Sequence, residues 1–312
     1  MRVDVEGTSW LTFSDGSPVR AASAIAPLGD GWLIVQDDAT HAAWWRSKSV
    51  TAVRVVDSVD GLEEFSSSAG TKHLKPDFEA ACAVSANGTH GVLLLGSGST
   101  GARMRASLVA MGAADHALSE AEPAFTVAGL ESVYRKVAAA LGLHHDQLNL
   151  EGACVVGDRL RWFQRGNFAA GTPTACVDVD LAELLAAVTG SIAADRVQVG
   201  DVRRYDLGAV GGVALAVTDA MSVAGGRVLV SAAAEDTPNA VDDGPVVGSA
   251  LALLDDEGVL ASVVVPESGR GAHKVEGLAV GATTADGLRL LAVVDADDPT
   301  VASELLVLRL RW

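Results

Sequence analysis

The feature that most constrains the fold of this chain is a hairpin pattern that occurs five times. In each copy a polar residue precedes a strand of small and apolar residues, a Gly-containing turn follows, and a second apolar strand returns, as in NLEGACVVGDRLRWFQ at residues 149–164. Gly suits such turns because it adopts positive φ angles without steric cost. The polar residues that begin the copies are Ser23, Glu79, Glu151, Asp219 and Glu276. The pattern therefore indicates a repeat fold.

The spacing of the copies predicts a β-propeller. Successive copies begin roughly 56 to 72 residues apart, which leaves room for about four strands in each unit, the usual content of a propeller blade. An unpaired strand at residues 2–5 can lie beside residues 305–310 and close the ring, which removes open sheet edges. We predict an all-β fold: one domain over residues 1–312, with five blades of about four antiparallel strands closed by the N- and C-terminal strands. Six blades are the alternative, and two β-sandwich domains rank below both.

Two segments predict short inserted helices. Leu130, Val133, Val137 and Leu141 recur at helical spacing, and Gly142 is a suitable stop. A second helix fits residues 181–188, where Asp180 can cap the N-terminus.

Composition excludes several classes of partner. The chain carries 40 Asp plus Glu against 23 Lys plus Arg, a formal charge of −17, which repels nucleic acid and anionic lipid. No apolar run approaches the ~18 residues of a membrane span, and the N-terminus resembles no secretion signal. We expect a cytoplasmic protein, either a monomer or a weak homo-oligomer, that binds neither nucleic acid nor membrane. The 3 Cys lack C-x-x-C spacing, which indicates no zinc site or disulfide framework.

The first strand of each propeller blade lines the central channel, so the polar residues that begin the copies should converge on one axis. Four of the five are carboxylates, whose mutual repulsion requires a cation, shared protons or basic partners. A Glu at the start of a small, apolar strand is also costly for packing alone. We therefore predict that these residues form part of a functional site.

Residues that precede the first strand or follow the second share one mouth of the channel. A concave site that gathers such polar groups is the default binding site. Loop Asp and Asn residues also cap turns, and a His beyond a helix end can serve the helix dipole, so a structural role is the alternative for each residue. The candidates for substrate binding or catalysis at this mouth are Asp38, Arg103, His145, Arg165, Asn167, Glu235, Asp236 and Lys274.

Three short motifs carry a resemblance to known propellers. LEGAC at residues 150–154, VEGLAV at 275–280 and DFEAACAV at 77–84 resemble the E-G-[IL]-A motifs of the esterase-like phytase and SMP-30/gluconolactonase group. LLLGSGST at residues 93–100 adds a resemblance to an uncharacterised bacterial propeller family. The resemblance implies that channel glutamates hold a divalent cation, usually calcium, and places Glu79, Glu151 and Glu276 at the metal. The resembled relatives have six blades, whereas this chain has five copies.

The leading functional hypothesis is binding of calcium or another divalent cation, and of a polar small molecule, in an acidic central channel. If the chain is an enzyme, the expected reaction is metal-dependent hydrolysis of an ester, lactone or phosphate ester. Asp219 or Glu235 would then act as base, and Arg103 or Arg165 would hold an anionic group. The alternatives are a non-catalytic scaffold propeller and a glycosidase-like hydrolase that uses a carboxylate pair. An aromatic content of only 4% disfavours sugar stacking in the latter.

Overall fold

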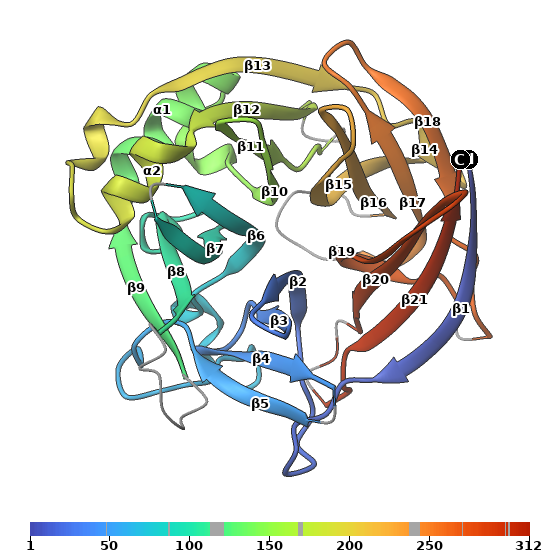
Figure 1. The fold of residues 1–312 in the computed structure, drawn as a ribbon, viewed down its shortest axis with the longest axis horizontal. Helices are drawn as coiled ribbons and strands as arrows, with labels where there is room; N and C mark the ends of the chain where they lie inside the picture. Colours follow the sequence, from blue (N-terminus) through green and yellow to red (C-terminus); the bar gives the residue numbers. More distant parts are fainter. Residues whose placement is uncertain are drawn as a thin grey trace.

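Five antiparallel sheets stand around one axis in the computed structural model of the chain (Figure 1). The structure describes residues 1–47, 49–86, 88–112, 122–167, 171–236, 244–269, 271–296, 298 and 300–312. The predicted five-bladed propeller is confirmed.

Each blade is formed by strands that follow one another in the sequence, apart from β1. Blade 1 contains β2 (Ala22–Leu28), β3 (Gly31–Gln36), β4 (His41–Arg46) and β5 (Ser49–Arg54). Blade 2 contains β6 (Phe78–Ala86), β7 (Thr89–Gly96), β8 (Arg105–Met111) and β9 (Pro123–Gly129). Blade 3 contains β10 (Leu150–Val156), β11 (Arg159–Gln164), β12 (Thr174–Asp180) and β13 (Val199–Tyr205). Blade 4 contains β14 (Ala209–Val210), β15 (Val213–Val223), β16 (Arg227–Glu235), β17 (Val246–Leu254) and β18 (Val259–Val264).

Blade 5 closes the ring with both ends of the chain. Its strands are β19 (Lys274–Thr284), β20 (Gly287–Asp295), β21 (Glu304–Arg311) and β1 (Arg2–Trp10). β1 pairs with β21 from Arg2 opposite Arg311 to Trp10 opposite Glu304, and the two termini lie side by side (Figure 1). The predicted closure is therefore confirmed.

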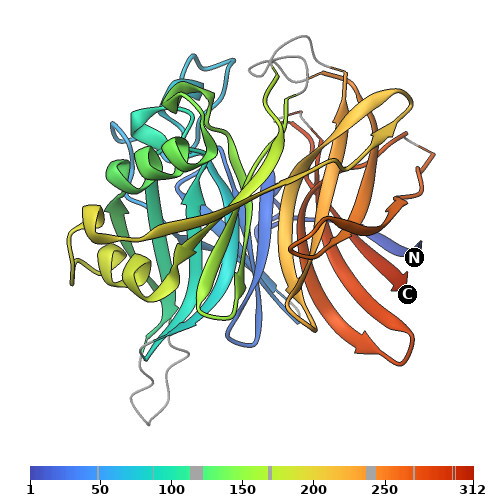
Figure 2. The ribbon, with the colours of Figure 1, turned by 90° about the horizontal axis from the view of Figure 1, so that it is seen from above.

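Two α-helices lie outside the ring beside blades 2 and 3 (Figure 2). α1 (Glu131–Leu141) ends at Gly142, whose φ of 74° is the left-handed conformation that favours Gly at a C-cap. α2 (Leu181–Val188) begins after Asp180, whose side chain accepts a hydrogen bond from the Glu183 amide at 3.0 Å. Both predicted helices are confirmed. Four 3₁₀ turns complete the described elements: η1 (Lys72–Leu74), η2 (Gly101–Arg103), η3 (His145–Gln147) and η4 (Ala194–Arg196). No helix among the described residues is long and apolar enough to cross a membrane.

The core is divided among the blade interfaces. Five clusters of buried apolar side chains are present, and each contains residues of two neighbouring blades. The cluster between blades 2 and 3 also includes the buried side of α1, where Tyr134 packs edge-on against Trp162 at 4.8 Å between ring centroids. The free cysteines Cys82, Cys154 and Cys176 are buried in these clusters. Apolar packing between blades therefore fixes where the inner strands meet the channel.

The inner strand of every blade carries a bulge near the same end. The pairing with the second strand skips Ser23 in blade 1, Glu79 in blade 2 and Glu276 in blade 5, and shifts across Glu151 in blade 3. In blade 4 the skipped residue is Thr218, not Asp219. The prediction that Asp219 is the equivalent of these residues is therefore wrong by one position.

Two hydroxyl groups confirm that Ser23 and Thr218 are equivalent. Ser23 Oγ donates to the carbonyl of Phe78, and Thr218 Oγ1 donates to the carbonyl of Val275, both at 2.6 Å. Each acceptor lies directly before the bulge glutamate of another blade. The hydroxyl groups at the bulges of blades 1 and 4 therefore bond to another blade. Blades 2, 3 and 5 carry a glutamate at the bulge instead.

Thr218→Val is expected to lower the free energy of unfolding by about 1–3 kcal/mol, because it leaves a buried carbonyl of Val275 without this donor. Urea denaturation measures the loss. Thr284→Val is the matched control, since its hydroxyl bonds Asp286 on the exposed surface, and it should change stability by less than ~0.5 kcal/mol. Equal stability of the two variants would contradict the role of Thr218.

Candidate functional site

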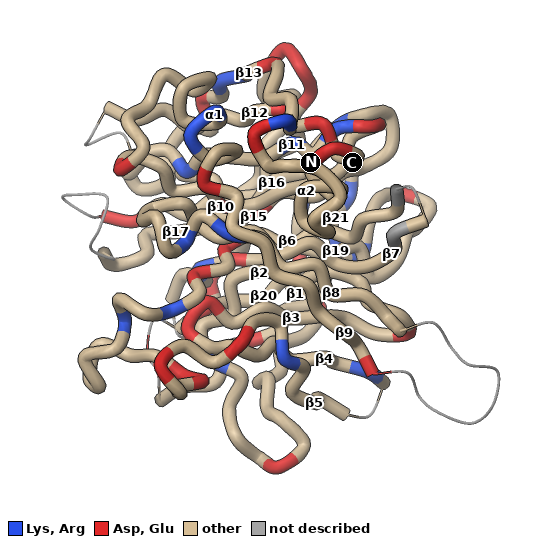
Figure 3. Tube along the Cα trace, turned by 90° about the vertical axis from the view of Figure 1, so that its left-hand side faces the viewer, with Lys and Arg blue, Asp and Glu red and all other residues tan. Residues whose placement is uncertain are grey.

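Charged side chains from all five blades form a ring at the end of the channel where the bulges lie. We call this set the mouth ring. Its members are Asp37, Lys75, Asp77, Glu79, Arg103, Glu151, Arg165, Glu235, Lys274 and Glu276. Seen from its side, the molecule shows more acidic than basic positions along its trace (Figure 3).

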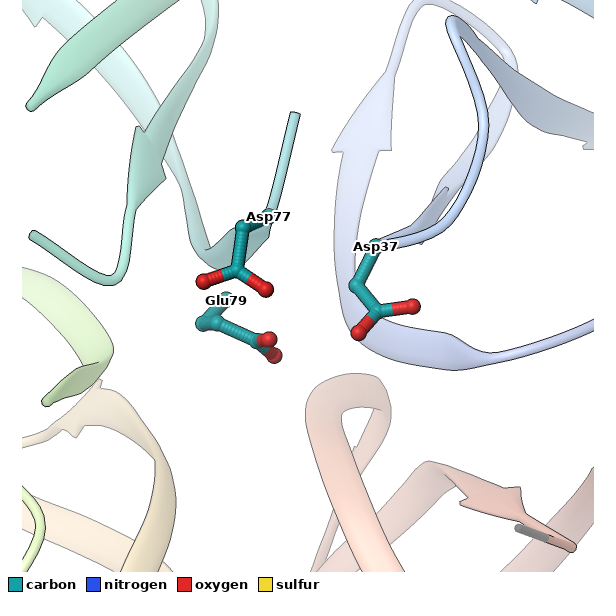
Figure 4. Close-up of side chains that lie close together, drawn as sticks. All are labelled: Asp37, Asp77 and Glu79. Carbon is teal, nitrogen blue, oxygen red and sulfur yellow. The ribbon is translucent and has the colours of Figure 1, made fainter. Parts of the chain in front are cut away.

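One half of the mouth ring is centred on Lys75. Its Nζ lies 2.6 Å from Asp77 Oδ1 and 3.7 Å from Glu79 Oε1, and it also donates to Asp37 Oδ2. Arg103 Nη1 contacts the other oxygen of Asp77 at 3.0 Å. The carboxyl groups of Asp37, Asp77 and Glu79 face the same space from blades 1 and 2 (Figure 4).

Backbone contacts between blades hold Asp77 in place. Its φ of 58° is unusual for a residue with a Cβ, and Ala21, at the same position of blade 1, also has a positive φ of 44°. The Asp77 amide donates to the carbonyl of Asp37 at 3.0 Å, and its own carbonyl accepts from the Ser97 amide at 3.0 Å. The Ser97 hydroxyl donates to the Asp77 carboxylate. The carboxylate is therefore fixed at a junction between blades 1 and 2.

The other half of the mouth ring links blades 3, 4 and 5. Arg165 Nη1 lies 3.0 Å from Glu151 Oε1, and its Nη2 lies 2.5 Å from Glu235 Oε1. Lys274 Nζ lies 3.7 Å from the same oxygen of Glu235 and 3.2 Å from Glu276 Oε1. Arg165 and Lys274 thus join three carboxyl groups into one chain of ion pairs.

The charges of the mouth ring balance when two carboxyl groups hold protons. Six carboxyl groups face four cations in this ring. Burial, reinforced by Asp37 and Asp77, raises the pKa of Glu79 well above its ordinary value. Burial also raises the pKa of Glu151 to about 8, although Arg165 opposes the shift. The pKa of Glu276 is raised by burial too, against Lys274. Protons on Glu79 and Glu151 are therefore sufficient to neutralise the ring.

The fixed charges around Lys75 stay ionised. Burial alone would lower the pKa of Lys75, but Asp37, Asp77 and Glu79 outweigh it and raise the pKa well above its usual range. Burial would raise the pKa of Asp77, but Lys75 and Arg103 lower it on balance. Lys75 is therefore an ammonium ion and not a nucleophile.

Two carboxyl oxygen atoms of the ring are buried without a hydrogen-bond partner among the described residues. They are Oε2 of Glu151 and Oε2 of Glu235, in side chains that are 7% and 3% exposed. Their other oxygens both contact Arg165. Buried polar atoms nearly always have partners, so these two are available to a bound molecule or to water.

One group of three carboxylates in the described part of the chain has the spacing of a metal site. The oxygens of Asp37, Asp77 and Glu79 lie within 4.8 Å of one another. Oxygen ligands of this kind suit a hard divalent cation. Of the residues that the family resemblance places at the metal, Glu79 belongs to this group, whereas Glu151 contacts Arg165 and Glu276 contacts Lys274. The Lys75 ammonium lies among the three carboxylates, so a metal ion fits only when Lys75 is displaced.

The remaining predicted residues lie around the ring. Asp38 contacts Arg20 at 3.5 Å in blade 1, and burial with the charge of Asp37 raises its pKa to about 6. Asn167 pairs through its backbone with Thr172, in both directions at 2.8 Å. Asp236 is exposed directly after β16, and His145 is exposed at the start of η3.

Asp219 is only 1% exposed, and its Oδ2 accepts from the Leu278 amide of blade 5 at 2.7 Å. Burial raises its pKa well above the ordinary value. Gly152 of blade 3 lies close to the backbone of Asp219. A Cβ at Gly152 would approach Asp219 Cα to 2.7 Å, so only Gly fits there. These contacts tie blades 3, 4 and 5 together.

No specific signal in the sequence indicated the central role of Lys75 among the mouth residues. The available signal was the alternation of Lys75, Asp77 and Glu79, which in an extended segment places the three side chains on one side. Asp37 reaches the same space from another blade.

Comparisons with known proteins identify a family and a fold. A family model described as a family of unknown function (DUF6910) matches residues 71–299. No curated protein sequence matches the chain. An exo-1,5-alpha-L-arabinanase from a bovine ruminal metagenomic library is similar in structure, with 11% identity, a TM-score of 0.50, and 96% of this chain and 95% of that chain covered. The PQQ-bound aldose sugar dehydrogenase of Streptomyces coelicolor has 10% identity and a TM-score of 0.48, with 99% and 98% covered. At such identities the likeness concerns the fold alone.

Proposed function

This chain belongs to DUF6910, a family of unknown function, and we propose from its channel mouth that it binds a polar small molecule there. The observation that carries the proposal is the pair of carboxyl oxygens on Glu151 and Glu235 that have no hydrogen-bond partner in the described part of the chain. A ligand that accepts a hydrogen bond from the protonated Oε2 of Glu151 and donates one to Oε2 of Glu235 would remove the cost of leaving them unpaired.

The charges of the mouth ring favour a ligand with hydroxyl or amine groups over a phosphorylated one. Arg103, Arg165, Lys75 and Lys274 all contact carboxylates already. An anionic ligand would have to break these ion pairs, and the charge of −17 on the chain would repel it. A neutral polyhydroxyl compound, a lactone or an amine fits better.

Acid–base hydrolysis is a second candidate function, supported by the pair formed by Glu151 and Glu235. With a pKa of about 8, Glu151 holds a proton at neutral pH and could donate it to a leaving group. Glu235, joined to it through Arg165, would act as the base. In this role Arg165 positions both carboxyl groups. The bond cleaved would be an ester, a lactone or a glycosidic bond.

Calcium, which the sequence resemblance implies, would have to compete with the cations of the mouth ring. The mouth ring reaches neutrality with its own cations and two protons, and Lys75 occupies the space between the metal-spaced carboxylates. The proposed binding therefore needs no metal ion. The chain residues themselves provide the contacts.

A ligand-observed NMR screen of neutral sugars, sugar lactones, polyamines and sugar phosphates tests the proposed binding. We expect hydroxyl- or amine-rich compounds to bind the wild type, and sugar phosphates to bind more weakly than the parent sugars. Combining Glu151→Gln with Glu235→Gln should weaken binding at least tenfold, because amide groups replace the carboxyl pair. Glu131→Gln, on the exposed side of α1, is the control and should leave binding unchanged. Absence of any binder, or equal binding by both variants, would favour a scaffold function.

A further inference from the structure

Lys75 occupies the position that a metal ion would take at the junction of blades 1 and 2. Its Nζ contacts a carboxyl oxygen from each of Asp37, Asp77 and Glu79, and its side chain is only 10% exposed. Those three carboxyl groups are also the group whose oxygens lie within 4.8 Å of one another. The ammonium and a metal ion therefore compete for one space.

We propose that Lys75 is a built-in counter-ion that closes a latent divalent-cation site, and that removing its ammonium group opens the site to calcium. The inference goes beyond the proposed small-molecule binding and does not depend on it, because it concerns the affinity of the unliganded protein for a cation.

The spacing of the carboxyl oxygens suits calcium once the ammonium is gone. Calcium binds oxygens at ~2.3–2.6 Å, so the oxygens around one ion lie up to roughly 5 Å apart. The three carboxyl groups meet this limit. The position of Asp77 is fixed by backbone contacts to Asp37 and Ser97, which are independent of Lys75. The ligand set should therefore survive substitution of the lysine.

The charge of the emptied site also matches a divalent ion. Without Lys75, three carboxylates would face only Arg103, which contacts Asp77 at 3.0 Å. Full ionisation would leave an excess of two negative charges at this junction. A calcium ion supplies the same number of positive charges, whereas in the wild type the Lys75 ammonium contacts all three carboxyl groups.

Lys274 provides a matched control on the opposite half of the mouth ring. Its side chain is 7% exposed and lies between two carboxylates, Glu235 at 3.7 Å and Glu276 at 3.2 Å. Within the described residues, these carboxylates do not form a group of three at metal spacing. Lys274→Met therefore removes the same charge from a comparable environment without opening a metal site.

Calorimetric titration of metal-free protein with calcium chloride tests the inference. We expect Lys75→Met to bind one calcium ion at least tenfold more tightly than the wild type, and calcium to raise the Tm of that variant alone. Lys75→Arg keeps the positive charge and should not gain binding. Lys274→Met should not gain it either. Adding Glu79→Gln to Lys75→Met should remove the gain.

Two outcomes would overturn the inference. One is a folded Lys75→Met protein whose calcium affinity equals that of the wild type. The other is an equal gain in Lys274→Met, which would assign the effect to lost positive charge in general. If Lys75→Met unfolds without metal, its refolding is followed with and without calcium. Recovery by calcium that is absent after adding Glu79→Gln supports the site, and failure to recover contradicts it.

Discussion

Arg165→Met is expected to lower the free energy of unfolding by about 3–5 kcal/mol at pH 8, because it leaves two buried carboxyl groups without their shared cation. Arg165 contacts Glu151 at 3.0 Å and Glu235 at 2.5 Å, and the side chains of the three residues are 18%, 7% and 3% exposed. The loss should shrink as the pH falls, since protonation removes the unpaired charges. Urea denaturation at several pH values measures both effects.

The control for this prediction is an exposed arginine pair. Arg135 contacts Glu131 at 2.7 Å on α1, but both side chains are more than half exposed, at 68% and 60%. Exposed pairs contribute little, so Arg135→Met should cost less than ~1 kcal/mol. A loss for Arg165→Met as small as that of Arg135→Met would show that the mouth ring is not a buried charge network.

The stability of the wild type is expected to depend on pH through Glu151. The folded protein holds the Glu151 proton up to a pKa of about 8, whereas the unfolded chain releases it near the ordinary value of 4.5. Between these values a rise in pH therefore favours unfolding, by up to ~1.4 kcal/mol per pH unit for one proton. The contribution is fully present below the ordinary value and is lost as the pH passes about 8.

Glu151→Gln isolates this contribution because the amide cannot titrate. The difference in stability between wild type and variant should change steadily from about pH 5 to pH 8, in favour of the variant at high pH. Glu131→Gln, which alters an exposed carboxylate, should leave the pH dependence of the wild type unchanged. Parallel pH profiles for wild type and Glu151→Gln would contradict a proton on Glu151.

The fold could be predicted because each copy of the repeat is recognisable from residues that are close together in the sequence. The copies that begin at Glu79, Glu151 and Glu276 each combine small residues with a Gly turn, and these features act within one hairpin. The closure of the ring followed from an unpaired strand at each end of the chain. The helical spacing of Leu130, Val133 and Val137 is likewise a local pattern. In the structure Val133 and Val137 lie in α1, and Leu130 is its N-cap.

The candidate site could be predicted only where it repeats the blade pattern. In blade 4 the sequence offers adjacent polar residues, Thr218 and Asp219, and the bulge that decides between them depends on strand pairing. The position of Lys75 depends on how far its side chain reaches toward Asp37 of another blade. Such contacts between blades arise from tertiary packing. Residue patterns along one blade do not encode them.

The mouth ring explains how several buried glutamates can be neutralised by side chains of the same ring. Lys75 and Arg103 supply fixed positive charges from blade 2, Lys274 supplies one from blade 5, and Arg165 supplies one between blades 3 and 4. Protons on Glu79 and Glu151 complete the balance. Among the described residues, the same arrangement leaves two buried oxygens without a hydrogen-bond partner, a donor on Glu151 and an acceptor on Glu235, for a polar ligand.

The most direct test of this charge balance is a carboxyl-carbon NMR titration of metal-free protein with ¹³C-labelled glutamate, with signals assigned through Glu79→Gln and Glu151→Gln. The Glu151 signal should titrate at a pKa of about 8, and the Glu79 signal should titrate at a pKa well above the ordinary glutamate value. If both signals titrate near the ordinary glutamate value of 4.5, the ring is not neutralised by these protons and the account is wrong.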